Sequence, residues 1–396
     1  MDKRLSIYIH IPFCVRKCLY CDFLSFPSDE KGMDRYVEAL CKEIVWESKS
    51  YVNYTVPTIF IGGGTPSLLP GEKTEKLLRT VYEHYHVEEN CEISMEANPG
   101  TITPEKLECW RRAGINRLSV GLQSGDDKEL KALGRIHSSA DFFQAYEEII
   151  KFGFNNINVD LMSAIPGQDM ESWKETLNKV LALNPPPVHI SAYSLIIEEG
   201  TPFYENTPEL PDEDTECEMY KITNDILCAH GYRQYEISNY AKPGYECRHN
   251  QVYWRRGNYV GFGLGAASMV ENVRFSNTSS MDSYVNYYAD VGCENMTDNG
   301  RLESIIKQDV KKLSIEEQME EFMFLGLRMT SGVSEEEFFR EFGKCIYEVY
   351  PKIVEDFCEK GLLKRSIDKE TGEHRIFLTR YGIDVSNIVM AEFLLT

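Results

Sequence analysis

The sequence contains no run of about 18 consecutive apolar residues, the shortest stretch expected of a membrane-spanning helix. It also has no low-complexity segment and no internal repeat beyond an alternation of strand-like and helix-like segments. Residues 1–4 lead directly into a predicted strand, so we expect no signal peptide. We therefore expect a cytoplasmic protein in a reducing compartment, with most of its cysteines as free thiols in the core. These scattered cysteines are Cys41, Cys91, Cys109, Cys217, Cys228, Cys293, Cys345 and Cys358.

Basic residues are also scarce. The chain has 42 Lys and Arg against 63 Asp and Glu, a formal net charge of −21 over 396 residues. A field of this sign repels a phosphate backbone, so we expect no nucleic-acid partner. The length allows one large α/β domain with an added module.

Three cysteines form a CxxxCxxC array directly after a short apolar strand over residues 5–11: Cys14, Cys18 and Cys21. Three thiolates can hold three irons of a [4Fe–4S] cluster, which normally takes four cysteines. No fourth cysteine lies nearby, so one iron would be open to another ligand. The alternative is a zinc site, which would need a further Cys or His; His10 lies on the preceding strand, where we expect it to point away.

Strand-like and helix-like segments alternate over residues 1–235. Six strands, each followed by a helical segment, predict a parallel sheet with right-handed crossovers that curls into a partial (β/α)6 barrel. Residues 236–310 read as a Gly-rich, aromatic region and an irregular linker with a short helix. Residues 311–396 predict helices and a β-hairpin, as in a winged-helix-like α+β module. The strands are expected at 5–11, 57–61, 92–97, 117–122, 156–162 and 189–195.

Polar residues follow the ends of successive predicted strands. A glycine-rich segment over residues 62–66 ends the second strand, and Glu96, Gln123 and Asp160 lie on the next three. Arg135 follows in the next helical connection. Since the C-terminal strand ends of such a barrel meet at one face, these side chains are expected to line one pocket. The alternative is a structural pair of Arg135 and Asp160 beside a solvated Glu96.

The chain resembles the radical S-adenosylmethionine (SAM) superfamily and, within it, the oxygen-independent coproporphyrinogen dehydrogenase-like family. The similarity spans residues 5 to about 270. The matching segments are YIHIPFCVRKCLYCDF, IFIGGGTPSLL, MEANPGT, INRLSVGLQS, LGRIHS, NVDLM, YRQYEISNYAKPGYECRHN and YWRRGNYVGFGLGAAS.

The resemblance implies a [4Fe–4S] cluster on the three cysteines, with SAM chelating the open iron. An electron from the cluster then cleaves SAM to a 5′-deoxyadenosyl radical. The resemblance also implies that Tyr8, Gly63 and Glu96 contact this SAM. Residues implied to line the same pocket or to hold a second SAM are Gly64, Thr65, Gln123, Arg135 and Asp160.

Within the family, the chain is most similar to the heme-chaperone branch. The dehydrogenase has a further cysteine two residues after the third, where this chain has Phe23. It also has an N-terminal extension, whereas only seven residues precede Tyr8 here. The segment from His249 to Trp254 matches the HNxxYW motif of the heme-chaperone branch.

That motif implies heme binding. His249 is then a candidate axial ligand of the iron, with Tyr253 and Trp254 packing on the macrocycle, and Cys247 is a second candidate ligand. On the residues alone, the alternative is that His249 and Asn250 cap a loop while the aromatic side chains fill core.

The resemblance therefore implies a heme chaperone that delivers heme to a respiratory acceptor protein, with an electron donor such as flavodoxin or ferredoxin. Such a donor would need a local basic patch on this acidic chain, which the sequence does not locate. Membrane association would be peripheral, through the acceptor. The alternatives are coproporphyrinogen III dehydrogenase, an activity we expect this chain to lack, and an RNA-modifying radical SAM enzyme, which would need a basic module.

Overall fold

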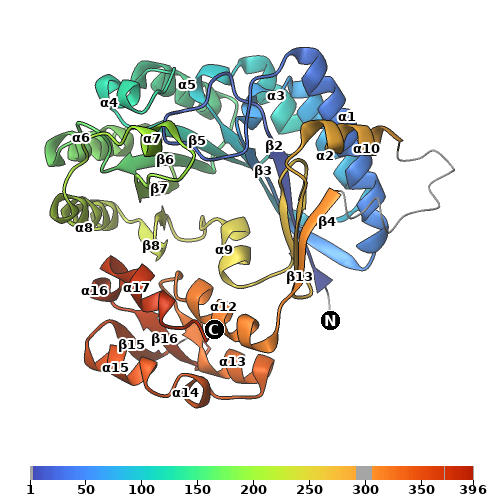
Figure 1. Cartoon of the computed structure of the whole chain (residues 1–396). Coiled ribbons are helices and arrows are strands. Elements are labelled where there is room, and N and C mark those ends of the chain that lie inside the picture. Colours follow the sequence, from blue (N-terminus) through green and yellow to red (C-terminus); the bar gives the residue numbers. More distant parts are fainter. Residues whose placement is uncertain (1–2, 291–305, 370, 396) are drawn as a thin grey trace.

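The computed structural model describes residues 3–290, 306–369 and 371–395 (Figure 1). Six neighbouring parallel strands form the centre of the main sheet, in the order in which they occur along the chain. They are β2 (Ser6–Ile11), β3 (Tyr54–Gly63), β4 (His86–Ala97), β5 (Arg117–Gln123), β6 (Ile157–Ser163) and β7 (His189–Ser194). The predicted partial (β/α)6 barrel is confirmed.

Helices connect these strands and cover the outer side of the sheet (Figure 1). They are α1 (Glu30–Glu47), α2 (Gly71–His84), α3 (Pro104–Arg112), α4 (Asp127–Ala132), α5 (Ser139–Lys151), α6 (Met170–Leu181), α7 (Pro202–Glu205) and α8 (Glu213–Ala229). Short 3₁₀ turns are η1 (Ser48–Ser50), η2 (Pro66–Leu68) and η3 (Pro99–Thr101). The hydroxyl of Thr103 caps α3 with Pro104 at its first position, as the sequence indicates.

The alternation of side chains along each strand gives the barrel two different faces. On β2, Ile7, Ile9 and Ile11 are fully buried in the main hydrophobic core. Tyr8 alternates with them and lines an interior cavity with Ser119 of β5. The inner face is therefore polar, and it positions the candidate site.

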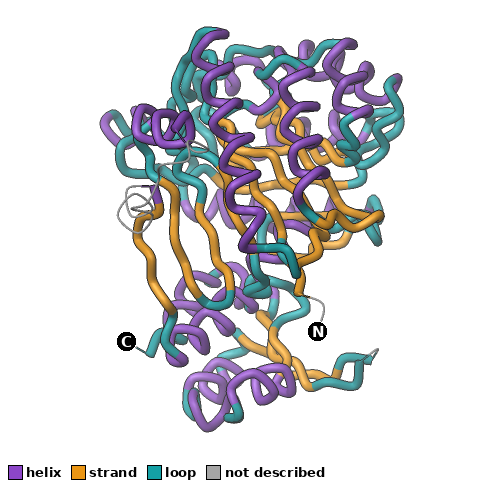
Figure 2. Tube along the Cα trace, turned by 90° about the vertical axis from the view of Figure 1, so that its right-hand side faces the viewer, coloured by secondary structure: helices purple, strands orange, loops and turns teal. Residues whose placement is uncertain are grey.

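Additional strands extend both edges of this sheet. At the β7 edge, β9 (Asn239–Ala241) and β8 (Arg233–Glu236) are antiparallel. At the other edge, β10 (Tyr259–Phe262) pairs parallel with β2, and three antiparallel strands follow it. These are β11 (Ala267–Val270), β12 (Val273–Asn277) and β13 (Lys307–Lys312), and they form a continuous layer with the barrel strands (Figure 2). A two-residue strand, β1 (Lys3–Arg4), pairs with β3.

Within residues 236–310, the expected irregular linker (residues 271–310) is thus wrong for β12 and for the start of β13, although the short helix is present as α10 (Met281–Asp290). Residues 291–305 of that segment lie outside the described residues. Every residue of β13 after Lys307 is exposed, so its sequence lacks the apolar alternation that predicts a strand.

The C-terminal residues form a module with its own hydrophobic core, which includes Met323, Phe338 and Ile376. Its helices and hairpin have the predicted winged-helix-like layout, with a three-stranded antiparallel sheet. The elements are α12 (Ile315–Gly326), β14 (Val333–Ser334), α13 (Glu335–Phe342), α14 (Ile346–Val349), α15 (Ile353–Glu359), β15 (Leu363–Ile367), β16 (His374–Leu378), α16 (Arg380–Asp384) and α17 (Ser386–Ala391).

The module contacts the barrel around α9 (Arg248–Trp254), as Figure 1 shows. Arg256, whose side chain is 4% exposed, pairs with Glu321 and Glu341 of the module. The guanidinium of Arg328 lies 4.4 Å from the centre of the Trp254 ring. In the described part of the chain, no helix is both long and apolar enough to cross a membrane.

Candidate functional site: a cysteine-lined cavity at the strand ends

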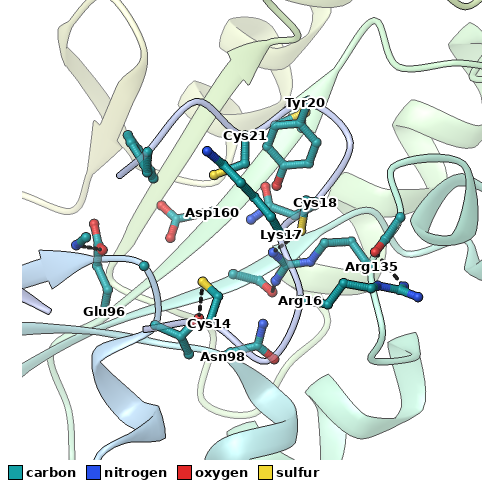
Figure 3. Close-up of a pocket in the computed structure, with 18 of the residues that line it drawn as sticks. Cys14, Arg16, Lys17, Cys18, Tyr20, Cys21, Glu96, Asn98, Arg135 and Asp160 are labelled. Atoms are coloured by element: carbon teal, nitrogen blue, oxygen red, sulfur yellow. Dashed lines mark hydrogen bonds between the residues drawn. The ribbon is translucent and has the colours of Figure 1, made fainter. Parts of the chain in front are cut away.

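A cavity of about 540 Å³ opens at the C-terminal ends of the barrel strands (Figure 3). The loop after β2 brings all three cysteines of the CxxxCxxC array to it. The other predicted residues of this pocket come from β3, β4, β5, β6 and the connection after α4. They are Gly63, Gly64, Thr65, Glu96, Gln123, Arg135 and Asp160, and all of them line the cavity. The predicted convergence is confirmed.

The three thiols are placed separately around this cavity. Cys14 Sγ lies 3.2 Å from Thr65 Oγ1, and Cys18 Sγ accepts a hydrogen bond of 3.5 Å from Arg135. Burial raises the pKa of the Cys21 thiol to about 11. In Figure 3 the three sulfur atoms do not meet at one point, and among the described residues no three His, Cys, Asp or Glu side chains are placed to hold one metal ion.

This donor set fits a cluster better than a single zinc ion. Zinc needs its ligands to converge on one atom, whereas each thiolate of a cubane cluster binds a different iron. His10 does not complete a zinc site, because its ring nitrogens lie 3.0 Å from Tyr8 Oη and 2.9 Å from the Leu24 carbonyl oxygen.

Two glycines let β3 pass tightly under the cysteine loop. Gly63 has φ of +116°, and a Cβ there would lie 2.6 Å from His10 Cε1. A Cβ on Gly64 would lie 2.8 Å from the Phe13 carbonyl oxygen and 3.1 Å from Cys14 Sγ. Only glycine fits both positions without displacing the loop, and the backbone is thereby left open toward the cavity.

Glu96 lies on the cavity wall, where its carboxylate accepts a hydrogen bond of 3.0 Å from the Gly63 N–H. Burial, and then the charge of Asp160, raises the pKa of Glu96 to about 8. At neutral pH the group therefore holds a proton unless a cation lies beside it. An ammonium group in the cavity would favour the carboxylate.

The structural pair of Arg135 and Asp160 does not form. Asp160 accepts hydrogen bonds from Ser119 at 2.9 Å and from Asn158 at 2.7 Å, while Arg135 donates to Cys18 and to the Gly121 carbonyl. Glu96 is not fully solvated either. The alternative to a convergent site is therefore wrong.

Gln123 ends β5 with φ of +70°, a conformation that is rare for residues other than glycine. Its side-chain oxygen accepts a hydrogen bond of 3.1 Å from the Tyr193 hydroxyl. Such backbone conformations are often found at ligand sites, where the surrounding structure holds them. The backbone conformation of Gln123 turns the end of β5 into the cavity.

A second cavity of about 270 Å³ lies inside the barrel, next to the first. The two share Glu96, Ser119, Asp160 and Tyr193. Tyr8 lines this inner cavity and not the cysteine-lined one. His249, Asn250 and Tyr253 of α9 line it from the other side.

His249 is fully buried, and both of its ring nitrogens have partners. Nδ1 lies 2.8 Å from Thr58 Oγ1, and Nε2 lies 2.8 Å from Tyr253 Oη. Burial, and then the charge of Arg117, lowers the pKa of His249 to about 3, so the imidazole is neutral. In this conformation no ring nitrogen is free to bind iron.

The carboxylate of Glu92 on β4 fixes the start of α9. It accepts hydrogen bonds from the backbone N–H groups of Arg248 at 3.1 Å and of His249 at 3.0 Å. Cys247 is buried, and burial raises the pKa of its thiol to about 12. Trp254 lines neither cavity and packs instead against Arg328.

Several residues around the two cavities were not predicted from the sequence. Arg117, Asn158 and Tyr193 line the cavities, and Glu92 binds the first N–H groups of α9. A signal was present: polar residues recur at every second position in β5 and β6, as in Arg117 and Ser119. A polar face on strands of a parallel sheet indicates a lined interior rather than a packed one.

Comparisons with known proteins agree with this geometry. The radical SAM superfamily matches residues 8–180, and the HemN C-terminal domain matches residues 313–385. The chain is 37% identical over 394 residues to "Heme chaperone HemW" of Bacillus subtilis, covering 98% of this chain and 99% of that protein. It is 36% identical to the HemW of Lactococcus lactis, covering 100% and 98%, and 44% identical over 267 residues to that of Escherichia coli, covering 67% and 70%.

Among solved structures, the fold is similar to the radical SAM enzyme coproporphyrinogen III oxidase (HemN) of Escherichia coli. The TM-score is 0.82 at 21% identity, and the match covers 100% of this chain and 91% of that one. This likeness supports the fold of both the barrel and the C-terminal module. The similarity to the HemW proteins extends over nearly the whole chain, and the chain belongs to the HemW family of radical SAM proteins.

Proposed function

We propose that this protein is a heme chaperone, which holds a [4Fe–4S] cluster and SAM, binds heme and delivers it to a respiratory acceptor protein. The observation that carries this function is the similarity over nearly the full length to relatives named heme chaperones, at 37% and 36% identity. The similarity includes both the barrel and the C-terminal module, so neither half has to be assigned a separate role.

Membership in the radical SAM superfamily implies the cluster and SAM. Cys14, Cys18 and Cys21 would each supply one thiolate to the cluster. When bound, the cluster supplies an electron for SAM cleavage. The ammonium group of SAM would pair with the Glu96 carboxylate beside Gly63, and that pairing would offset the raised pKa of Glu96.

Phe23 favours the chaperone over coproporphyrinogen III dehydrogenase. It stands where the dehydrogenase has a further cysteine, and its side chain is 57% exposed at the rim of the cysteine-lined cavity. A phenyl ring can neither bind iron nor relay a proton. This chain therefore lacks one group that the dehydrogenase has beside its cluster.

For heme, we propose that His249 is the iron ligand after Tyr253 has moved away from Nε2. The neutral imidazole is the form that binds iron. The inner cavity, at about 270 Å³, is small for a macrocycle. Heme binding at this position therefore includes an opening of α9 away from the barrel.

For the electron donor, we propose a flavodoxin-type or ferredoxin-type protein that docks at the cysteine loop. Arg16 and Lys17 are both exposed on this loop and line the mouth of the cavity. They are a local basic feature on a chain with a net charge of −21. An acidic donor is electrostatically compatible with that position.

The test separates the chaperone from the dehydrogenase. The cluster is reconstituted anaerobically, and the protein is assayed in parallel for heme retention and for turnover of coproporphyrinogen III with SAM. We expect a stable heme complex, transfer of that heme to an apo-acceptor and no decarboxylation. Steady decarboxylation with SAM consumed in step would overturn the chaperone function.

A further inference from the structure

A buried arginine inside the barrel has no counter-charge in contact with it. Arg117 is the first residue of β5 and is 2% exposed. Its side chain makes no hydrogen bond and no ion pair with any described residue, and its Nε is buried without a partner. Because removing a guanidinium from water costs several kcal/mol, buried arginines are normally paired.

The acidic groups nearest to Arg117 are held by other donors. Glu92 accepts from the N–H groups that begin α9, Asp160 accepts from Ser119 and Asn158, and Glu96 accepts from Gly63. Burial raises the pKa of Glu96 to about 8, which weakens its negative charge at neutral pH. Glu92 and Asp160 attract the guanidinium of Arg117 through space, but no described acceptor atom forms a hydrogen bond with it.

Arg117 lines the inner cavity of about 270 Å³. Hydroxyl and amide side chains line the same space, including Ser119, Ser191, Asn250 and Tyr253. The hydroxyls of Ser119 and Ser191 already donate to Asp160 and Asn158, so the Asn250 amide is the group that can donate a hydrogen bond to an anion beside Arg117. The volume suits a small polar group and is below the usual range for a whole cofactor.

We propose that the inner cavity is a carboxylate-binding site in which Arg117 pairs with the anion. Guanidinium and carboxylate are geometrically matched for two parallel hydrogen bonds, which makes a carboxylate the favoured anion. Since the two cavities share Glu96, Ser119, Asp160 and Tyr193, two sources can supply it. One is a free small carboxylate, and the other is the carboxylate arm of a larger molecule held in the cysteine-lined cavity. The site does not depend on heme binding.

The test uses ¹³C-formate as the probe, on cluster-reconstituted protein saturated with SAM so that the open iron is occupied. Line broadening of the formate signal is measured against concentration. Wild-type protein should bind formate saturably, Arg117→Met should bind it at least tenfold more weakly, and Arg117→Lys should retain part of the affinity. Arg233→Met removes an exposed arginine on β8 and should leave binding unchanged.

Two further arms identify the source of the carboxylate. If Arg117-dependent formate binding occurs only without SAM, the carboxylate of SAM occupies the site; if added iron protoporphyrin displaces formate, a propionate does. Binding that neither ligand disturbs indicates a free small carboxylate. A crystal soaked in bromide should show anomalous density beside Arg117, which tests the site even if Arg117→Met does not fold.

Absence of saturable formate binding to wild-type protein both with and without SAM would overturn the site. Equal binding by a folded Arg117→Met variant would do so as well, and would mean that water alone solvates the guanidinium. A bromide peak elsewhere in the barrel, with none at Arg117, would also count against it.

Discussion

His249 and Tyr253 face each other across one turn of α9, with 2.8 Å between the imidazole Nε2 and the phenol oxygen. The Tyr253 ring also packs edge-on against Tyr259 at a centroid distance of 4.7 Å. The nitrogen that would bind iron is thus blocked by the hydroxyl of Tyr253 alone. A substitution at Tyr253 can remove this hydroxyl and leave His249 in place.

Replacing Tyr253 with phenylalanine should strengthen heme binding. The variant keeps the ring packing but removes the hydrogen bond that must break, which is worth roughly 0.5–1.5 kcal/mol. Heme affinity, measured by Soret titration, should rise about 2- to 12-fold. His249→Ala should lower heme occupancy and shift the Soret band. Tyr259→Phe is the matched control for Tyr253→Phe. An unaltered heme spectrum in His249→Ala would mean that another residue binds the iron.

Each cysteine of the triad should be required for the cluster. Cys14→Ala, Cys18→Ala and Cys21→Ala should each lose most of the iron and sulfide after anaerobic reconstitution, because each thiolate binds its own iron. Cys217→Ala removes an exposed thiol and should reconstitute fully. Full iron and sulfide content in the Cys18→Ala protein would contradict the assignment.

Glu96 should contribute to SAM affinity. Glu96→Ala leaves the SAM ammonium without its partner at a cost of roughly 2–4 kcal/mol, which equilibrium dialysis on cluster-loaded protein would measure. Glu198 lies at the exposed rim of the same cavity, so Glu198→Ala should change SAM affinity little. If both variants bind SAM as wild type does with the cluster intact, the ammonium lies elsewhere.

Stability should fall as the pH rises through neutrality. Glu43 of α1 is buried, accepts hydrogen bonds from Gly263, Asn277 and Tyr284, and has its pKa raised from 4.5 to about 7, chiefly by burial. The folded protein therefore binds more protons than the unfolded chain between these two values. Raising the pH through that window removes stability, by roughly 3 kcal/mol in total from this group.

Urea unfolding of the cluster-free protein at pH 5, 6, 7 and 8 would measure this dependence. Glu43→Gln should remove the part of the slope that comes from Glu43, while the larger contribution of Glu96 remains, since the pKa of Glu96 is raised further, to about 8. An identical slope in Glu43→Gln and wild type would mean that Glu43 ionises normally in the folded protein.

The sequence was informative where geometry follows from strand order. Glu96, Gln123 and Asp160 could be assigned to one cavity because parallel strands present their C-terminal ends at one edge, whatever the details of packing. The Gly63–Gly64 segment was similarly readable, because only glycine tolerates that approach to the cysteine loop.

Other features depend on contacts between distant segments. The burial of His249 requires Thr58 on β3 and Glu92 on β4, residues 191 and 157 positions away along the chain. No local pattern connects them. The edge strand β13 escaped prediction for a different reason: its residues after Lys307 are exposed and mostly polar or charged, so no apolar alternation marks it, while its neighbour β12 is only five residues long.

The contacts of Trp254 and Arg256 with the C-terminal module connect two equilibria. Trp254 is the last residue of the HNxxYW segment and Arg256 follows it closely, and their partners Arg328, Glu321 and Glu341 belong to the module. If α9 opens only when these contacts break, a ligand that favours the open helix must weaken the docking of the module by the same free energy. A protein that binds the module must in turn change the affinity for heme. Hydrogen exchange in α12, measured with and without heme, would report this coupling. Unchanged protection of α12 would show that α9 and the module respond independently.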